Sequence, residues 1–354
     1  MPLDSPDSAV SAPDPAAPVL VERLRGGAVE SRHRGRAVVA DRAGRVIARW
    51  GDVDAPCFPR SAVKPILALP LVESGAADAF GFDDADIALA CGSHAGQPAH
   101  VERVAAILAR LGLEPGHLAC GGHSPFHGPS AEALIRAGRA PGPLHDNCSG
   151  KHAGMLATAV HLGEPVAGYA ERTHPVQQRC LGVLEQLTVQ DLGDAAWGRD
   201  GCAIPTYAVP LGGLAVAMAR FADPIELPEP RAAAVERVRH AWGAEPFFVA
   251  GDGRIDTVAM AATGGRILTK GGAEGVHAAA VPEAGLGIAL KIEDGAGRAA
   301  EVALVALLEG LGLLDTAALS ALTAFRRPSV RTRNGLEAGA LVPAEALSRP
   351  QDAP

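Results

Sequence analysis

Apolar residues recur along this chain with two different periods, and the order of those periods limits the folds that it can adopt. Short Val- and Ile-rich runs lie towards both ends, as in the hairpin expected at residues 36–50, and such runs are typical of strands. In the middle, apolar residues repeat every three or four positions, most clearly at residues 99–111, which is the spacing of an amphipathic helix. We therefore predict a mixed α/β (α+β) fold. A mostly antiparallel sheet built from both ends of the chain is flanked by helices and interrupted by a helical region at about residues 65–190.

The same patterns place the remaining elements and the ends of the folded part. A helix is expected from Ser61 to Gly75, with further helices at about 149–162, 174–188, 229–242 and 298–314. Strands are expected at about 203–210, 247–250, 256–260, 266–269 and 286–292. We expect residues 1–18 to form a disordered tail and residues 344–354 a flexible one. The remaining residues, 19–343, are expected to form a single unit, and they contain no internal repeat.

Charge and segment composition exclude several function classes. The formal net charge is −8 and the chain has no basic cluster, so we expect no nucleic-acid binding. No apolar stretch is long enough to span a bilayer, and the N-terminus lacks the positive start and apolar run of a secretory signal. We therefore expect a cytoplasmic protein without membrane contact. Its six cysteines would lie in a reducing compartment, where metal binding or core packing is more common than a disulfide.

Lysine is scarce in this chain. Of 32 Lys and Arg residues only four are lysines, which leaves 28 arginines. The four lysines are Lys64, Lys151, Lys270 and Lys291. An arginine cannot supply a neutral nitrogen, whereas a lysine can when its pKa is lowered. Positions that keep lysine in so arginine-rich a chain are therefore candidates for chemistry.

The first candidate is the pattern Ser61-x-x-Lys64, which follows Arg60 at the start of an expected helix. Residues three apart on a helix share a face. A serine hydroxyl needs a base to become a nucleophile, and a lysine acts as one when burial or a neighbouring cation such as Arg60 lowers its pKa. The spacing alone is equally consistent with a catalytic pair and with a helix-capping serine beside a solvated lysine.

Two further segments carry candidate proton-transfer groups. Ser93 and His94 lie in a run of small residues, where either side chain suits substrate binding or proton transfer, although an ordinary glycine loop fits that run better when it is taken alone. Thr269-Lys270-Gly271 follows a β-rich run. Lysine scarcity favours a cleft-lining Lys270 over a surface turn.

Two cysteines far apart in the sequence suggest a metal site. Cys148 and His152 lie in a segment dense in functional groups, and Asp200 and Cys202 follow farther on. These four residue types bind zinc. No Cys-x-x-Cys pair supports the site, and two buried free cysteines explain the pattern slightly better.

Taken together, these motifs resemble a known family. Ser61-x-x-Lys64 with Thr269-Lys270-Gly271 resembles serine β-lactamases, penicillin-binding proteins and serine-dependent glutaminases. With the segments Cys91–His94, Asp146–His152 and Asp200–Cys202 in this order, the chain resembles the class 3, rhizobial-type L-asparaginases from about Val21 to Leu314. The Asn-Cys-Ser-Gly-Lys-His segment is the most specific part of the match.

The resemblance implies a fold like that of serine β-lactamases and glutaminases, one catalytic unit and a homodimer. It implies two catalytic Ser–Lys pairs, Ser61 with Lys64 and Ser93 with Lys270. It also implies a zinc ion that supports substrate binding rather than the chemistry. Its implied ligands are Cys148, Lys151 and Cys202, with Asp200 behind them, so that Lys151 replaces His152 in the ligand set.

The activity implied is hydrolysis of the side-chain amide of L-asparagine to L-aspartate and ammonia through a serine acyl-enzyme. We further expect Arg60 and His94 to contact the substrate. A glutaminase or a penicillin-recognising serine hydrolase is the nearest alternative. A zinc hydrolase that uses metal-bound hydroxide, and a zinc-stabilised asparagine-binding protein without catalysis, are alternatives of other classes.

Overall fold

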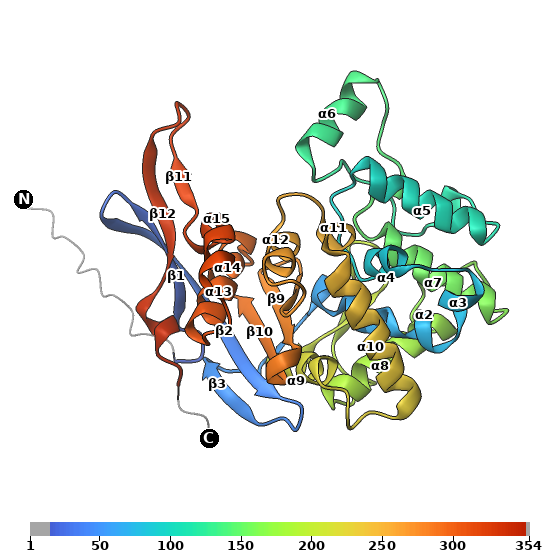
Figure 1. Ribbon diagram of the computed structural model, residues 1–354, viewed down its shortest axis with the longest axis horizontal. Helices are drawn as coiled ribbons and strands as arrows, with labels where there is room; N and C mark the ends of the chain where they lie inside the picture. The colour runs from blue at the N-terminus through green and yellow to red at the C-terminus, as the bar shows by residue number, and fades with distance from the viewer. Residues whose placement is uncertain (1–14, 352–354) are drawn as a thin grey trace, which may run out of the picture.

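The computed structural model describes residues 15–351, and its centre is a curled sheet whose strand pairs are all antiparallel (Figure 1). The order across the sheet is β11 (Ser329–Arg331), β12 (Glu337–Pro343), β1 (Val19–Arg25), β2 (Ala28–Asp41), β10 (Leu286–Ile292), β9 (Val276–Val281) and β8 (Leu268–Gly271). Strand β3 (Val46–Trp50) pairs with β2 and completes the expected hairpin. Both ends of the chain thus contribute to one antiparallel sheet, as the sequence predicted.

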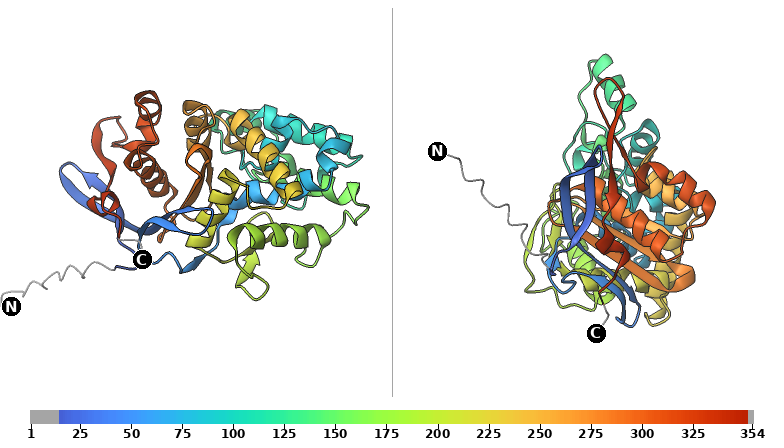
Figure 2. Two further views of the ribbon diagram at one scale, coloured as in Figure 1. Left: turned by 60° about the horizontal axis from the view of Figure 1, so that its bottom comes forward. Right: turned by 90° about the vertical axis from the view of Figure 1, so that its left-hand side faces the viewer.

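The inner strands of the sheet carry apolar side chains on both faces, so helices cover the sheet on both sides. On one side Val39, Ile288 and Leu290 pack with α13 (Gly297–Gly310), near α12 (Ile255–Ala262), α14 (Thr316–Ala321) and α15 (Thr323–Arg326). On the other side Val38 and Ala289 join the core of the helical region. Figures 1 and 2 show these two helical layers on either side of the inner strands.

The second layer begins with α9 (Leu211–Ala222), which lies directly on β10. A Cβ atom added at Gly287 would lie 1.9 Å from the carbonyl oxygen of Ala215 and 2.3 Å from the backbone nitrogen of Ala219. Only glycine allows so close an approach of helix and strand.

The helical region fills the other end of the molecule in Figure 1. Its helices are α1 (Lys64–Leu67), α2 (Leu69–Glu73), α3 (Ala76–Ala79), α4 (Asp84–Ala90), α5 (Pro98–Arg110), α6 (Gly128–Arg136), α7 (Ser149–His161), α8 (Pro175–Thr188), α10 (Glu229–Ala244) and α11 (Pro246–Ala250). Helix α7 is buried on nearly every side and forms its centre. Helices continue to Ala262, so the region is longer than the expected 65–190.

The predicted helices at 99–111, 149–162, 174–188, 229–242 and 298–314 are confirmed within a few residues, as are the strands at 266–269 and 286–292. The strands predicted at 247–250 and 256–260 are wrong, because those segments form α11 and α12. A short apolar run has the same composition in a buried helix as in a buried strand. The helix expected from Ser61 to Gly75 is divided into a 3₁₀ turn, α1 and α2, with a proline near the start of both α-helices.

The stretch from residue 344 to 351, expected as part of a flexible tail, packs on the sheet instead. Glu345–Ser348 form a 3₁₀ turn in which Leu347 is buried. The indole nitrogen of Trp50 donates to the carbonyl oxygen of Ala346 at 3.1 Å. The Trp50 side chain is buried, and a buried indole N–H needs such an acceptor, which helps to hold the stretch in place. Residues 1–14 and 352–354 of the two predicted tails lie outside the described residues.

Within residues 15–351, no helix combines the length and the apolar character that crossing a bilayer would require.

Candidate active site

Ser61 lies in a 3₁₀ turn (Arg60–Val63) that leads directly into α1, where Lys64 is the first residue. The turn follows β4 (Pro56–Cys57), which pairs with β7 (Val209–Pro210). Arg60, directly before Ser61, has the left-handed backbone angle φ +52°, which is uncommon for a residue with a side chain. Such backbone conformations persist where the surrounding structure holds them, and they gather at functional sites.

Lys64 is fully buried and contacts Ser93 rather than Ser61. Its Nζ atom donates to the carbonyl oxygen of Gly92 at 2.6 Å and lies 2.8 Å from Ser93 Oγ. Within the described part of the chain, the Ser61 hydroxyl makes no hydrogen bond. The hydrogen bonds thus join Lys64 to the serine that the family resemblance assigned to Lys270.

The loop that carries Ser93 is fixed by its neighbours. The backbone N–H of Ser93 donates to Val249 in α11 at 2.7 Å. His94 accepts from the N–H of Gly96 through Nδ1 at 3.2 Å, and its Nε2 lies 2.8 Å from Ser149 Oγ in α7. Burial lowers the pKa of His94 well below its usual value, so the ring is neutral. Both ring nitrogens of His94 are thus used inside the protein, where they hold the Ser93 loop in place, and its contact with a substrate stays a prediction.

Lys270 in β8 is also fully buried, and its Nζ donates to the carbonyl oxygen of Gly271 at 2.7 Å. Burial lowers the pKa of Lys270 to about 7, with help from Lys64, while the Asp256 carboxylate opposes the shift. A Cβ atom added at Gly272 would lie 2.7 Å from the carbonyl oxygen of Pro59, so the end of β8 lies against the turn that carries Ser61.

Asp256 contacts this lysine and is not among the residues predicted from the sequence. Asp256 Oδ2 lies 3.8 Å from Lys270 Nζ, and His277 Nε2 lies 2.9 Å from Asp256 Oδ1. Asp256 was hidden in a segment predicted as a strand. The signal that was available is an acidic residue inside an apolar run, in Arg-Ile-Asp-Thr-Val-Ala-Met.

Cys148, Lys151 and Cys202 converge beside this group, and all three are buried. Lys151 Nζ lies 2.9 Å from Cys202 Sγ. A hydrogen bond from the Cys202 thiol lowers the pKa of Cys148 well below its usual value, whereas it raises the pKa of Cys202. Burial lowers the pKa of Lys151, but the two sulfurs outweigh that effect and raise it. The contact with Cys202 therefore favours the thiolate form of Cys148.

Two sulfurs and an amine in contact suit a soft divalent cation such as zinc, which prefers thiolate and nitrogen ligands. Within residues 15–351, no group of three or more His, Cys, Asp and Glu side chains is placed to hold a metal ion. The candidate set therefore depends on its lysine. His152 contacts the Tyr169 hydroxyl through Nδ1 at 2.6 Å. Asp200 Oδ2 lies 3.9 Å from Cys202 Sγ, and Asp200 Oδ1 accepts from Arg60 at 2.7 Å.

Ser61, Lys64, Lys151, Asp200 and Arg60 line one cavity. Its volume is only about 20 Å³, room for about one water molecule. Its remaining wall comes largely from α8 and from the segment 204–207, which includes strand β6 (Pro205–Tyr207), the partner of β5 (Trp197–Arg199). A substrate of amino-acid size therefore requires part of the wall to move.

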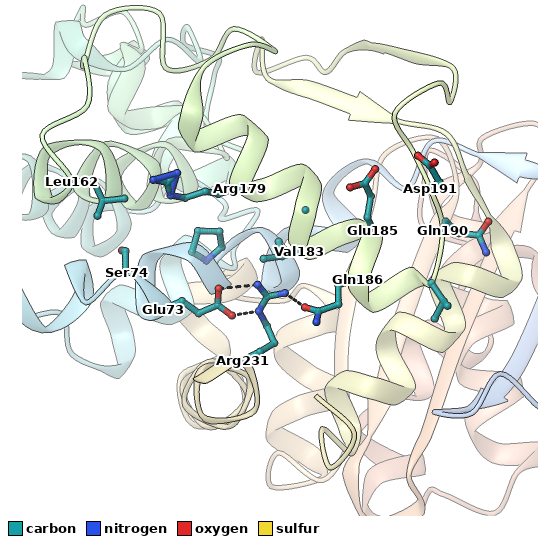
Figure 3. A pocket seen from close by; sticks show the side chains of 13 residues that line it. Glu73, Ser74, Leu162, Arg179, Val183, Glu185, Gln186, Gln190, Asp191 and Arg231 are labelled. Carbon is teal, nitrogen blue, oxygen red and sulfur yellow. Dashed lines mark hydrogen bonds and ion pairs between the residues drawn. The ribbon is translucent and has the colours of Figure 1, made fainter. Parts of the chain in front are cut away.

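A larger groove of about 1150 Å³ lies elsewhere, between α2, α8 and α10 (Figure 3). Arg231 crosses it to Glu73 and Gln186. None of the predicted site residues lines this groove, so its size does not make it the active site.

The family model described as L-asparaginase II matches residues 21–343. No curated protein sequence matches the chain. Among solved structures, Mglu in its native form in the presence of 4.3 M NaCl is 17% identical, with 81% of this chain and 63% of that chain covered and a TM-score of 0.43. A second structure of native Mglu is 18% identical, with coverages of 81% and 66% and the same TM-score of 0.43. A β-lactamase from Mycobacterium bovis is 17% identical, with coverages of 82% and 94% and a TM-score of 0.33.

This chain thus spans less than two thirds of the length of the two native Mglu chains. The family match covers most of the sequence and includes every predicted site residue. The chain belongs to the L-asparaginase II family.

Proposed function

We propose that this protein is an amidohydrolase that converts L-asparagine to L-aspartate and ammonia. Membership of the L-asparaginase II family supports hydrolysis of a small-molecule amide. The observation that carries the proposal is the burial of Lys64, Lys151 and Lys270, of which the first two line one cavity with Ser61 while Lys64 also contacts Ser93. Burying an ammonium group is costly, so a fold that buries three of its four lysines uses them for more than charge.

In the proposed mechanism, Ser61 Oγ bonds to the side-chain amide carbon of asparagine while neutral Lys64 takes its proton. The carbon–nitrogen bond then breaks, and the leaving nitrogen receives a proton and departs as ammonia. Water cleaves the resulting ester to give L-aspartate, and the hydroxyl proton returns to Ser61. Backbone N–H groups at the start of the helix suit the developing oxyanion.

Ser93 and Lys270 serve as the second pair in this scheme. The 2.8 Å contact between Lys64 and Ser93 supports a path along which a proton from Ser61 reaches Ser93 through the Lys64 amine. Lys270, with its pKa lowered to about 7, is able to exchange a proton near neutral pH.

Arg60 is the proposed partner of the substrate α-carboxylate. Its guanidinium is now paired with Asp200 and lines the closed cavity. Opening the wall would release the guanidinium for the substrate, so that one ion pair is exchanged for another.

The proposed zinc ligands are Cys148, Lys151 and Cys202, with Asp200 behind Cys202. The lowered pKa of Cys148 favours the thiolate that binds a cation, whereas the raised pKa values of Lys151 and Cys202 mean that a cation must displace their protons. A bound zinc ion would supply positive charge for substrate binding. A homodimer and a cytoplasmic location stay predictions.

The test compares Ser61→Ala and Ser93→Ala in ammonia release from asparagine, glutamine and, for ring opening, nitrocefin. Loss of the serine nucleophile should reduce kcat by about 10³-fold or more, with the fold intact by circular dichroism. We expect that loss for Ser61→Ala on asparagine. Because Lys64 contacts Ser93, the matched variant Ser93→Ala is needed to decide which of the two hydroxyls is the nucleophile. Mass spectrometry of a trapped acyl-enzyme identifies the modified serine.

Other outcomes select the alternatives. Faster turnover of glutamine or nitrocefin would make the protein a glutaminase or a penicillin-recognising hydrolase. Complete loss of activity with a strong chelator, with Ser61→Ala active, would indicate a zinc hydrolase. Binding of asparagine without ammonia release would indicate a binding protein and refute the proposal.

A further inference from the structure

Asp256 is a carboxylate buried in the core beside the candidate active site. It is the second residue of α12, and its exposed fraction is 4%. A carboxylate in such a position is stable only when its oxygens are paired. The hydrogen-bond partners of Asp256 therefore indicate which part of the structure the carboxylate stabilises.

Those partners lie on both sides of Lys270. Asp256 Oδ1 accepts from the hydroxyl of Thr269 at 3.0 Å, and Asp256 Oδ2 accepts from the backbone N–H of Gly271 at 3.0 Å. His277 on the neighbouring strand β9 completes the set through Nε2, 2.9 Å from Oδ1. The carboxylate thus binds the residues before and after Lys270 and fixes that part of β8.

Asp256 is also the main group that favours a charged Lys270. Its Oδ2 lies 3.8 Å from the amine. Burial, Lys64 of α1 and Arg254 before α12 all disfavour the charge, whereas Cys148 before α7 adds a smaller favourable contribution. Cys91 after α4 faces the lysine as well, and burial raises the pKa of its thiol, so it is neutral. Asp256 stays ionised, because His277, Lys270 and Gly271 outweigh the effect of burial and lower its pKa.

We propose that Asp256, supported by His277, is the positioning residue of Lys270: it fixes the part of β8 that carries the lysine and places a carboxylate oxygen 3.8 Å from the amine, which is thereby held for proton exchange. This inference rests on the proposed role of Lys270 in proton transfer. It adds a third component, Lys270–Asp256–His277, to the two Ser–Lys pairs.

The test follows the pH at which Lys270 titrates, in the full-length protein. Selectively ¹³Cε-labelled lysine gives four resonances, one for each lysine, and Lys270→Arg assigns the one of interest. In Asp256→Asn the favourable charge is lost, so the Lys270 resonance should titrate about 1–3 pH units lower than in the wild type. The acidic limb of kcat/KM for ammonia release should move in the same direction. Thr269→Val removes one hydrogen bond but no charge, and it should leave both midpoints in place.

A second variant serves if Asp256→Asn does not fold. His277→Phe removes the partner that holds Asp256 Oδ1 at 2.9 Å, so the carboxylate loses its support and the Lys270 midpoint should fall, in the same direction as in Asp256→Asn but by less. Lower activity with unmoved midpoints would reduce Asp256 to a structural role and overturn the inference. Wild-type activity in Lys270→Ala would instead refute the proposed role of Lys270, whatever the resonances show.

Discussion

The buried Lys270 predicts a pH-dependent contribution to stability that needs no assumption about catalysis. In the unfolded chain its pKa is about 10.4, whereas in the fold it is about 7. Below pH 7 both states are protonated, and the fold carries the cost of a buried charge. Between pH 7 and 10.4 the unfolded state binds the extra proton, so stability must rise with pH across that window.

The perturbation that isolates this contribution is Lys270→Met, which is similar in length and has no charge. One pKa unit corresponds to 1.36 kcal/mol. Between pH 6 and 9.5 the wild type should therefore gain about 3 kcal/mol of unfolding free energy relative to Lys270→Met. Other titrating groups are common to both proteins, and their contributions largely cancel in the difference.

Urea unfolding of both proteins at pH 6, 7, 8 and 9.5 measures this difference, and equal m-values show that both unfold to a similar extent. Lys291→Met serves as the control, because Lys291 is only partly buried and binds two backbone carbonyls. Its difference from the wild type should vary little over the same range. A flat difference for Lys270→Met would refute the conclusion that the fold holds a neutral amine at position 270.

Two further predictions concern packing and metal binding. Gly287→Ala should lower the free energy of unfolding by about 1–3 kcal/mol, because the added Cβ would meet the backbone of α9. Gly297→Ala is the control: the space around its Cβ position is open, so stability should change little. Thermal unfolding of the two variants checks this. Cys148→Ala should reduce the zinc that the protein retains after purification, as measured by elemental analysis. Cys57→Ala removes a buried cysteine outside the proposed ligand set and should leave the zinc content unchanged. Equal zinc in the two variants would contradict the proposed ligands.

Lysine usage was the most informative feature of the sequence. Three of the four lysines are buried at the candidate site, although nothing in their local sequence distinguishes a buried lysine from an exposed one. Their scarcity carried the information, because arginine occupies nearly every position where a solvated cation suffices. Lys291, the fourth, is half-buried and donates to backbone carbonyls.

Which serine each lysine contacts was not available from local spacing. Ser61 and Lys64 are three residues apart and line one cavity, as a shared helix face implies. The direction of the Lys64 side chain depends on the Ser93 loop, which is positioned by backbone contacts to Val249 and Asn147. These contacts join segments far apart in sequence, so no pattern in one segment encodes them.

Asp256 was missed for a related reason. Its segment was assigned to a strand, and alternating burial along a strand gives no cause to place a carboxylate in the core. As a helix, the same segment turns Ile255, Asp256 and Ala259 inward. An error in secondary structure thus concealed a candidate functional residue.

The pairing of β2 with both β1 and β10 has a consequence for synthesis. Strand β1 directly precedes β2 in the sequence. Strand β10, in contrast, emerges from the ribosome only after the whole helical region, and β12 later still. Contacts this distant in sequence form slowly, because a long loop must close first. The edge of β2 that pairs with β10 therefore stays without its partner until the helical region between them has been synthesised.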